Sequence, residues 1–226
     1  MSKERSLVQF EEDRKDAASI AARLLLASAT TAPRVGGVGE CTTHILDDEC
    51  DIEDLCQQIE RMADEQEAWQ FFKRDATVLR DADAVLLVTS LRCLYDPADI
   101  NCNMCGKLTC EYMKKEEKLP LDEPGVAYTG PLCTFRANNI AYAVDGIISS
   151  ARNLGIDYGV FWSAGAAAMR MDLLPKATGF ALGVGISITE KSPFRDIPHR
   201  YDEINEKTMN DRIIQRLWPQ FRSIYS

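Results

Sequence analysis

The segment Ala84-Val-Leu-Leu-Val-Thr-Ser90 is a continuous apolar run of strand length. A strand with one face in water alternates apolar and polar side chains, whereas an unbroken apolar run indicates a strand that is covered on both faces. We therefore expect residues 84–90 to form the centre of a sheet, with the rest of the chain arranged around it.

Helices and short strands are predicted on both sides of this central strand. Before it, helical patterns cover residues 8–27, 52–62 and 69–80, and a short strand covers residues 42–46. After it, helices are expected at 140–154 and 164–174, and strands at 158–162 and 179–189. Gly155 follows the apolar stripe of the first of these later helices and is a typical residue just past a helix end.

Composition limits the classes of function. A chain of 226 residues with 46% hydrophobic and 27% charged residues is long enough for one good-sized core. The formal net charge of -9 repels phosphate backbones and anionic lipid, so we expect neither nucleic acid nor a membrane surface as a partner. No apolar run is long enough to span a bilayer and no apolar leader follows the charged N-terminus, so we expect a cytoplasmic protein.

Residues 91–133 interrupt the regular pattern and contain five of the eight cysteines. We expect one domain over residues 1–200 with an inserted module at about 91–135, followed by a helical C-terminal extension at 201–226. The extension is amphipathic, so its apolar side needs a surface to cover, and a partner subunit could provide that surface. In a reducing compartment the cysteines are more plausible as packing residues, nucleophiles or metal ligands than as disulfides.

The spacing of four cysteines points to a metal. Cys102, Cys105 and Cys110 form a Cys-x2-Cys-x4-Cys pattern, and Cys133 follows after 22 intervening residues. An iron–sulfur cluster needs several thiolates that converge from a flexible loop, since each iron takes one cysteine. Gly106 permits a tight turn and leaves backbone N–H groups free to point at sulfur. We predict a 4Fe-4S cluster with these four cysteines as ligands.

Two alternatives to this ligand set remain open. A structural zinc usually has two close pairs of ligands, whereas here the second gap is four residues and Cys133 stands alone, so zinc is the weaker hypothesis. Cys93 lies nine residues before the triplet and competes with Cys133 as the fourth ligand. The other three cysteines are interpreted as packing or incidental thiols: Cys41, Cys50 and Cys56.

Several segments resemble a known family of proteins that contain a ferredoxin domain, from anaerobic bacteria and archaea. The resemblance is carried by INCNMCGKLTCEYM (100–113) with GPLC (130–133), and by AARLLLASATTAPRVGGVGE (21–40), FFKRDATVLRDADAVLLV (71–88) and GVGISITEKSPFRD (183–196). It covers about residues 12–200 and implies a 4Fe-4S cluster on the four cysteines.

That family in turn resembles the flavin-dependent nitroreductases, which are dimeric α+β proteins with flavin mononucleotide (FMN) at the subunit interface. The resemblance rests on TAPRVGG (31–37), on the helix over residues 139–154 and on ALGVGIS (181–187). It implies an FMN site and a homodimer. The implied residues lie near the flavin ring, at Pro33, Arg34 and Gly36, and near its phosphate, at Ser163, Ala164, Gly165 and Lys191.

The sequence and the resemblance together predict an α+β fold, with helices around a mostly antiparallel sheet and an inserted 4Fe-4S module; a doubly wound α/β sheet is the alternative. The expected function is electron transfer or small-molecule reduction through the cluster, with FMN as a candidate second cofactor. A non-enzymatic electron carrier or cluster-binding accessory protein is the second hypothesis, and a zinc-stabilised interaction module is the third. No catalytic residue is assigned.

Overall fold

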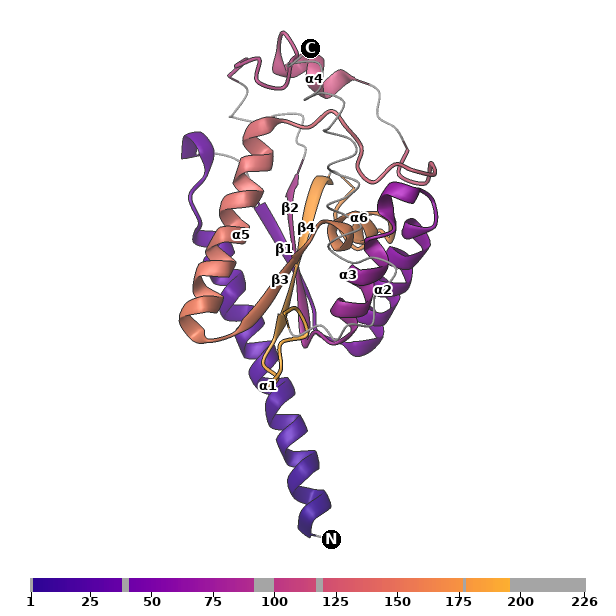
Figure 1. The fold of residues 1–226 in the computed structure, drawn as a ribbon. Helices are drawn as coiled ribbons and strands as arrows, with labels where there is room; N and C mark the ends of the chain where they lie inside the picture. The colour runs from indigo at the N-terminus through magenta and orange to yellow at the C-terminus, as the bar shows by residue number, and fades with distance from the viewer. Residues whose placement is uncertain (1, 38–40, 92–99, 117–119, 177, 196–226) are drawn as a thin grey trace, which may run out of the picture.

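The computed structural model describes residues 2–37, 41–91, 100–116, 120–176 and 178–195 (Figure 1). Cys93 and the predicted extension at 201–226 lie outside these residues. The elements in chain order are α1 (Ser2–Thr31), η1 (Val35–Gly37), β1 (Cys41–Leu46), α2 (Glu49–Ala63), η2 (Glu67–Trp69), α3 (Phe72–Arg80), β2 (Ala84–Leu91), α4 (Cys110–Lys115), α5 (Thr134–Leu154), β3 (Asp157–Phe161), α6 (Trp162–Arg170) and β4 (Thr178–Ser187).

The four strands form one antiparallel sheet in the order β1-β2-β4-β3. Cys41 of β1 pairs with Ser90 of β2, and Ala84 of β2 pairs with Ile186 of β4. The predicted central strand therefore lies inside the sheet, and all of residues 84–90 are buried. Because every pairing is antiparallel, the doubly wound α/β alternative was wrong and the mostly antiparallel prediction is confirmed.

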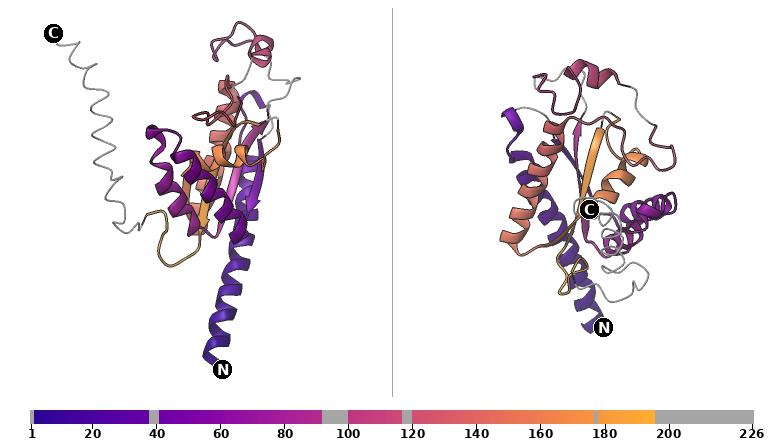
Figure 2. Two further views of the ribbon diagram at one scale, coloured as in Figure 1. Left: turned by 90° about the vertical axis from the view of Figure 1, so that its right-hand side faces the viewer. Right: turned by 45° about the horizontal axis from the view of Figure 1, so that its top comes forward.

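Helices cover both faces of the sheet, as Figures 1 and 2 show. Ala84, Leu86 and Val88 face α1 and α5, whereas Val85 and Leu87 face the layer of α2, α3 and α6. This alternation follows from the period of two in a strand: each strand residue supplies one of two separate cores. The continuous apolar sequence of β2 is thus explained by two hydrophobic layers rather than by parallel pairing.

The local sequence explains where the principal helices begin and end. Asp48 accepts a hydrogen bond from Cys50 N at 2.8 Å and so caps the start of α2. Gly155 adopts φ 70° and ends α5, as its position in the sequence predicted. In the described part of the chain, no helix is long and apolar enough to cross a membrane.

Candidate functional site

The cysteine loop lies at one end of the sheet. β2 ends at Leu91 and delivers the chain to this end, and α5 starts there at Thr134. Figures 1 and 2 both place the loop that carries α4 beyond the end of the sheet at which α5 begins. Cys102, Cys105 and Cys110 therefore lie at the same end of the molecule as Cys133.

The loop is shaped by three residues in left-handed backbone conformations. Asn101, Asn103 and Gly106 have φ values of 49°, 61° and 76°. Asn101 Oδ1 accepts a hydrogen bond from Cys110 N at 2.8 Å, which ties the start of the loop to its end. A Cβ at Gly106 would meet no atom within 4 Å, so glycine is required there by its φ and not by lack of space.

The four cysteines differ in how firmly they are placed. Cys110 is the first residue of α4, whose N-cap Thr109 accepts from Tyr112 N at 3.2 Å. Cys133 is the N-cap residue of α5, where its carbonyl accepts from Ala137 N at 3.1 Å and its side chain makes no capping bond. Cys102 is exposed, whereas the other three are half-buried.

All four residues are free thiols. Within the residues that the structure describes, no three His, Cys, Asp or Glu side chains lie close enough together to hold a metal ion. The fit of a cluster to this end of the molecule therefore rests on the donor set of four thiols and on the turns of the loop. Cys56, by contrast, is fully buried, and burial raises the pKa of its thiol to about 12, as expected for a packing residue.

The arm that returns from the loop to α5 is fixed by buried polar contacts. Glu65 Oε2 accepts from Gly125 N at 2.8 Å and is paired with Arg170, which donates to Val126 O at 2.6 Å. The Arg170 guanidinium beside Glu65 lowers the pKa of that carboxyl. Tyr128 is partly buried, and its hydroxyl donates to the Ala181 carbonyl of β4 at 2.7 Å. Cys133 thus follows an anchored segment.

A polar cluster lies beneath the start of α5. Arg136 is 7% exposed and donates to Ser90 Oγ at 3.5 Å, and Asn139 is 2% exposed and accepts from Val35 N at 2.7 Å. Cys41 pairs with Ser90 across the two strands. These contacts gather the ends of α1 and β2 and the starts of β1 and α5 around one buried point.

Sequence reasoning missed this cluster. Arg136 and Asn139 occur three and six residues after Cys133, on the side of the helix that also carries the apolar stripe. The signal that could have revealed the cluster was the presence of polar residues inside a predicted apolar stripe.

Arg34, one of the predicted flavin contacts, caps a helix. Its guanidinium donates to Ala32 O at 2.7 Å and to Ala29 O at 3.1 Å, so it satisfies carbonyls at the end of α1. Pro33 and Gly36 flank it on the surface, and Gly36 has φ 67°. This segment lies at the end of the sheet that carries the cysteine loop, because Val35 is bonded to α5.

The three predicted phosphate contacts on α6 are buried. Ser163, Ala164 and Gly165 are all part of the core, and Ser163 Oγ donates to Asp75 Oδ2 at 2.6 Å. A Cβ at Gly165 would come within 2.0 Å of the Ala181 carbonyl, so this glycine lets α6 approach β4 closely. Their small side chains serve helix–sheet packing in this chain.

Lys191 lies at the opposite end of the sheet. It lines a cavity of about 840 Å³ together with Arg14 of α1. Seventeen residues of helix separate Arg14 from Thr31 at the end of α1, which is roughly 25 Å at 1.5 Å per residue. One chain therefore does not bring Lys191 beside Pro33, Arg34 and Gly36.

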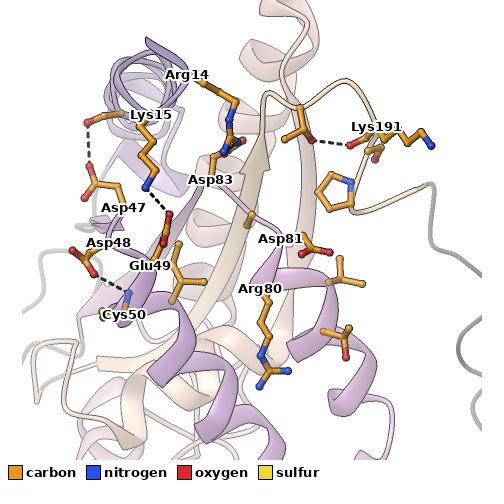
Figure 3. A pocket seen from close by; sticks show the side chains of 18 residues that line it. Arg14, Lys15, Asp47, Asp48, Glu49, Cys50, Arg80, Asp81, Asp83 and Lys191 are labelled. Atoms are coloured by element: carbon orange, nitrogen blue, oxygen red, sulfur yellow. Dashed lines mark hydrogen bonds and ion pairs between the residues drawn. The ribbon is translucent and has the colours of Figure 1, made fainter. Parts of the chain in front are cut away.

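The charged groups of this cavity hold elements together (Figure 3). Asp83 is paired with Arg14, and its Oδ2 accepts from Ile188 N at 2.8 Å and from Ser187 Oγ at 3.1 Å. Lys15 of α1 and Glu49 of α2 form a second ion pair, at 2.6 Å. Figure 3 shows Lys191 extending away from Arg14 and Asp83.

With this geometry established, comparison with known proteins supports the resemblance read from the sequence. Residues 129–197 match a family described as "Uncharacterized protein containing a ferredoxin domain". A protein of Archaeoglobus fulgidus is 28% identical over 190 residues, which cover 84% of this chain and 97% of that protein. The family match contains Cys133 and the buried Arg136, and it does not reach the cysteine triplet.

The fold is nitroreductase-like. A nitroreductase with bound FMN from Bacteroides fragilis superposes with a TM-score of 0.50 at 10% identity, over 82% of this chain and 86% of that chain. A putative nitroreductase in complex with FMN from Desulfovibrio desulfuricans gives a TM-score of 0.45 at 15% identity, over 76% and 74%. At these identities the similarity concerns the fold alone.

Burial of the Asp75 carboxyl makes the stability of this nitroreductase-like fold dependent on pH. Burial raises the pKa of Asp75 to about 6 from its usual 3.8, against the opposing effect of the Ser163 hydrogen bond. The folded state therefore binds the proton more tightly than the unfolded state. The contribution of Asp75 to the free energy of unfolding should be largest below about pH 4 and should be lost as the pH rises through about 6.

We predict that Asp75→Asn removes this decline. Relative to the parent, the variant should gain about 2–3 kcal/mol in free energy of unfolding at pH 8 and little at pH 4, since an amide still accepts from Ser163 and stays neutral. Urea unfolding at the two pH values measures the difference. The exposed Asp81→Asn is the control, and an unchanged pH slope in Asp75→Asn would contradict the assignment.

Proposed function

We propose that the protein is an iron–sulfur redox protein that holds a 4Fe-4S cluster through Cys102, Cys105, Cys110 and Cys133. The observation that carries the proposal is the position of all four thiols at one end of the sheet, where β2 leads into the cysteine loop and α5 leads out of it. The family match described above, with its ferredoxin domain, supports the same chemistry.

The chain would contribute thiolate ligands and backbone donors to such a centre. Left-handed backbone at positions 101, 103 and 106 gives the loop the tight turns that would let several thiolates approach one centre. When bound, the cluster supplies one-electron transfer, which these side chains alone do not provide. The exposure of Cys102 leaves the centre near the surface, where electrons can be exchanged with another protein.

Transfer of electrons to a partner protein, without a reaction of its own, is the function that the geometry supports best. Ser163, Ala164 and Gly165 are buried and Lys191 lies at the other end of the sheet, so the predicted flavin residues do not form one site within the chain. FMN-dependent reduction of a small molecule is the second candidate. It is favoured by the position of Pro33, Arg34 and Gly36 at the end that carries the cysteine loop.

We also propose that the protein forms a homodimer. One side of α1 exposes apolar residues at helical spacing, with Ile20 61% and Leu24 53% exposed between Ala17 and Ala27. The first turns of α1 also project beyond the rest of the described fold (Figure 2). An isolated stretch of helix is marginal in water, so a second chain packed on this side would stabilise it.

The cluster assignment predicts a different outcome for each class of cysteine. Cys102→Ala, Cys105→Ala, Cys110→Ala and Cys133→Ala should each lower the iron content and the visible absorbance of anaerobically purified protein, because one iron loses its ligand. Cys56→Ala is the matched control: it should keep its iron and lose about 1–2 kcal/mol of stability through a small cavity. Full iron in all four ligand variants would refute the assignment.

The same spectra separate the alternative centres. Bound zinc with no colour would favour the zinc-stabilised module. Loss of iron in Cys93→Ala but not in Cys133→Ala would identify Cys93 as the fourth ligand.

The flavin candidate is tested by calorimetric titration of iron-replete protein with FMN. If FMN binds beside Pro33, Gly36→Val should weaken binding at least tenfold, because a β-branched residue is strained at φ 67° and its side chain occupies the approach to the backbone. Lys191→Glu should leave the affinity unchanged. Loss of binding in Lys191→Glu would instead place this lysine at the flavin site of a second chain. If the parent protein does not bind FMN, the FMN-dependent function is excluded.

The dimer is tested on the exposed side of α1. Leu24→Glu should convert the dimer to a monomer at micromolar concentration in light scattering, because a carboxylate in an apolar interface is costly to desolvate. Arg23→Glu is the control, because it adds a negative charge at the neighbouring exposed position without replacing an apolar side chain. A parent protein that is already monomeric would contradict the proposal.

A further inference from the structure

The last strand of the sheet, β3, has an exposed edge. It ends the order β1-β2-β4-β3, so its outer side has no strand partner among the described residues. Natural sheets often cover such an edge with a helix or loop, because unpaired backbone groups otherwise pair with another chain. Tyr158 and Val160 are two residues apart and share one face of β3, the face on which Tyr158 packs against the core of α1 and α5. Val160 is 43% exposed.

The last turn of α5 adds a second exposed apolar side chain beside this edge. Leu154 is 54% exposed, and α5 leads directly into β3 at the end of the sheet opposite the cysteine loop (Figure 1). Arg152 Nε donates to the Tyr158 hydroxyl at 2.7 Å and so fixes this turn against the strand. We call the surface formed by Leu154, Tyr158 and Val160 the β3 edge surface.

The chain that follows β4 returns to β3 and is fixed there. Ser192 Oγ donates to Asp157 Oδ2, and Arg195 N donates to Ser192 Oγ at 2.9 Å. Phe194 packs against the core of α2, α3 and α6, whereas the Arg195 guanidinium lies 5.5 Å from the centre of the Tyr158 ring, which belongs to the opposite face. The chain therefore leaves the described residues at the outer edge of β3.

The sequence that follows Arg195 complements this surface in charge and in apolar pattern. Residues 202–206 contain three carboxylates, while Arg152 and Arg195 both place a guanidinium beside Tyr158, and the Arg195 side chain is 63% exposed. Apolar residues then recur at every fourth position, the spacing of a stripe on one side of a helix. They are Met209, Ile213 and Leu217.

We propose that residues 201–226 dock on the β3 edge surface of their own chain. The carboxylates of residues 202–206 meet Arg152 and Arg195, and the apolar stripe covers Leu154 and Val160. Residues 196–200 reach at most about 17 Å, which is sufficient because the chain already stands at this edge. Burial of exposed apolar area favours the contact, and the docked segment keeps the edge of β3 from pairing with another molecule.

The test is hydrogen exchange of the full chain, with each variant measured on the other side of the contact. Val160→Glu should speed exchange of the amides of residues 209–217 about tenfold, because a carboxylate on this surface opposes burial of the apolar stripe. Leu217→Glu should in turn speed exchange of the outer amides of residues 157–161. Two matched controls should change neither region: Gln215→Glu, on the opposite side of the stripe, and Leu108→Glu, on the exposed cysteine loop.

The two variants give the test independent arms. Residue 217 lies outside the described core, so Leu217→Glu remains informative if Val160→Glu does not fold. Residues 209–217 that exchange as fast in the parent as in a synthetic peptide of residues 201–218 overturn the inference, and so does exchange that Leu217→Glu leaves unchanged in β3. Protection that disappears on dilution also overturns it, because the segment then docks on a second chain. These outcomes are independent of iron content, so the proposed cluster is tested separately.

Discussion

Burial of β2 on both faces is the constraint on which the rest of the structure depends. Its alternate side chains enter two different cores, so neither helical layer can form without this strand. The two ends of β2 are then fixed by polar contacts of different kinds. At one end Asp83 is bonded to α1 and to the residues after β4, and at the other Ser90 contacts Arg136. The direction in which the chain leaves the sheet toward the cysteines is therefore determined by the core.

The proposed ligands are held with unequal rigidity, and this affects how a cluster would be acquired. Cys133 follows an arm that Arg170 and Tyr128 anchor, and Arg170 is itself held by its ion pair with the partly buried Glu65. The loop over residues 101–110 is closed mainly by its own turns, with Asn101 bonded to Cys110 N. One fixed ligand and three on a loop imply that cluster binding completes the folding of the loop, so iron content and loop order should be coupled.

The elements of the fold were predictable because burial leaves a periodic pattern, as in residues 84–90 and in the stripe of α5. The spacing of the four cysteines is visible in the sequence in the same way, but their role as cluster ligands stays a prediction. The flavin residues were not predictable in the same way. Small residues such as Ser163 and Gly165 suit both close approach to a ligand and close packing of a helix on a strand, and here Ala181 O lies where a side chain of residue 165 would be. The roles of Arg34 and Arg136 depend on contacts across the fold, which a linear pattern does not contain.

The two candidate functions make different demands on the shape of the molecule. Reduction of a small molecule needs a cavity next to the electron source, whereas a carrier needs only a surface that another protein can approach. The cavity of about 840 Å³ lies beside Arg14 and Asp83, at the end of the sheet away from the cysteines. Around the cysteines the loop exposes large apolar side chains, with Leu108 74% and Tyr112 63% exposed. Exposed apolar surface of this kind suits brief contact with another protein, which is consistent with the proposed transfer of electrons to a partner.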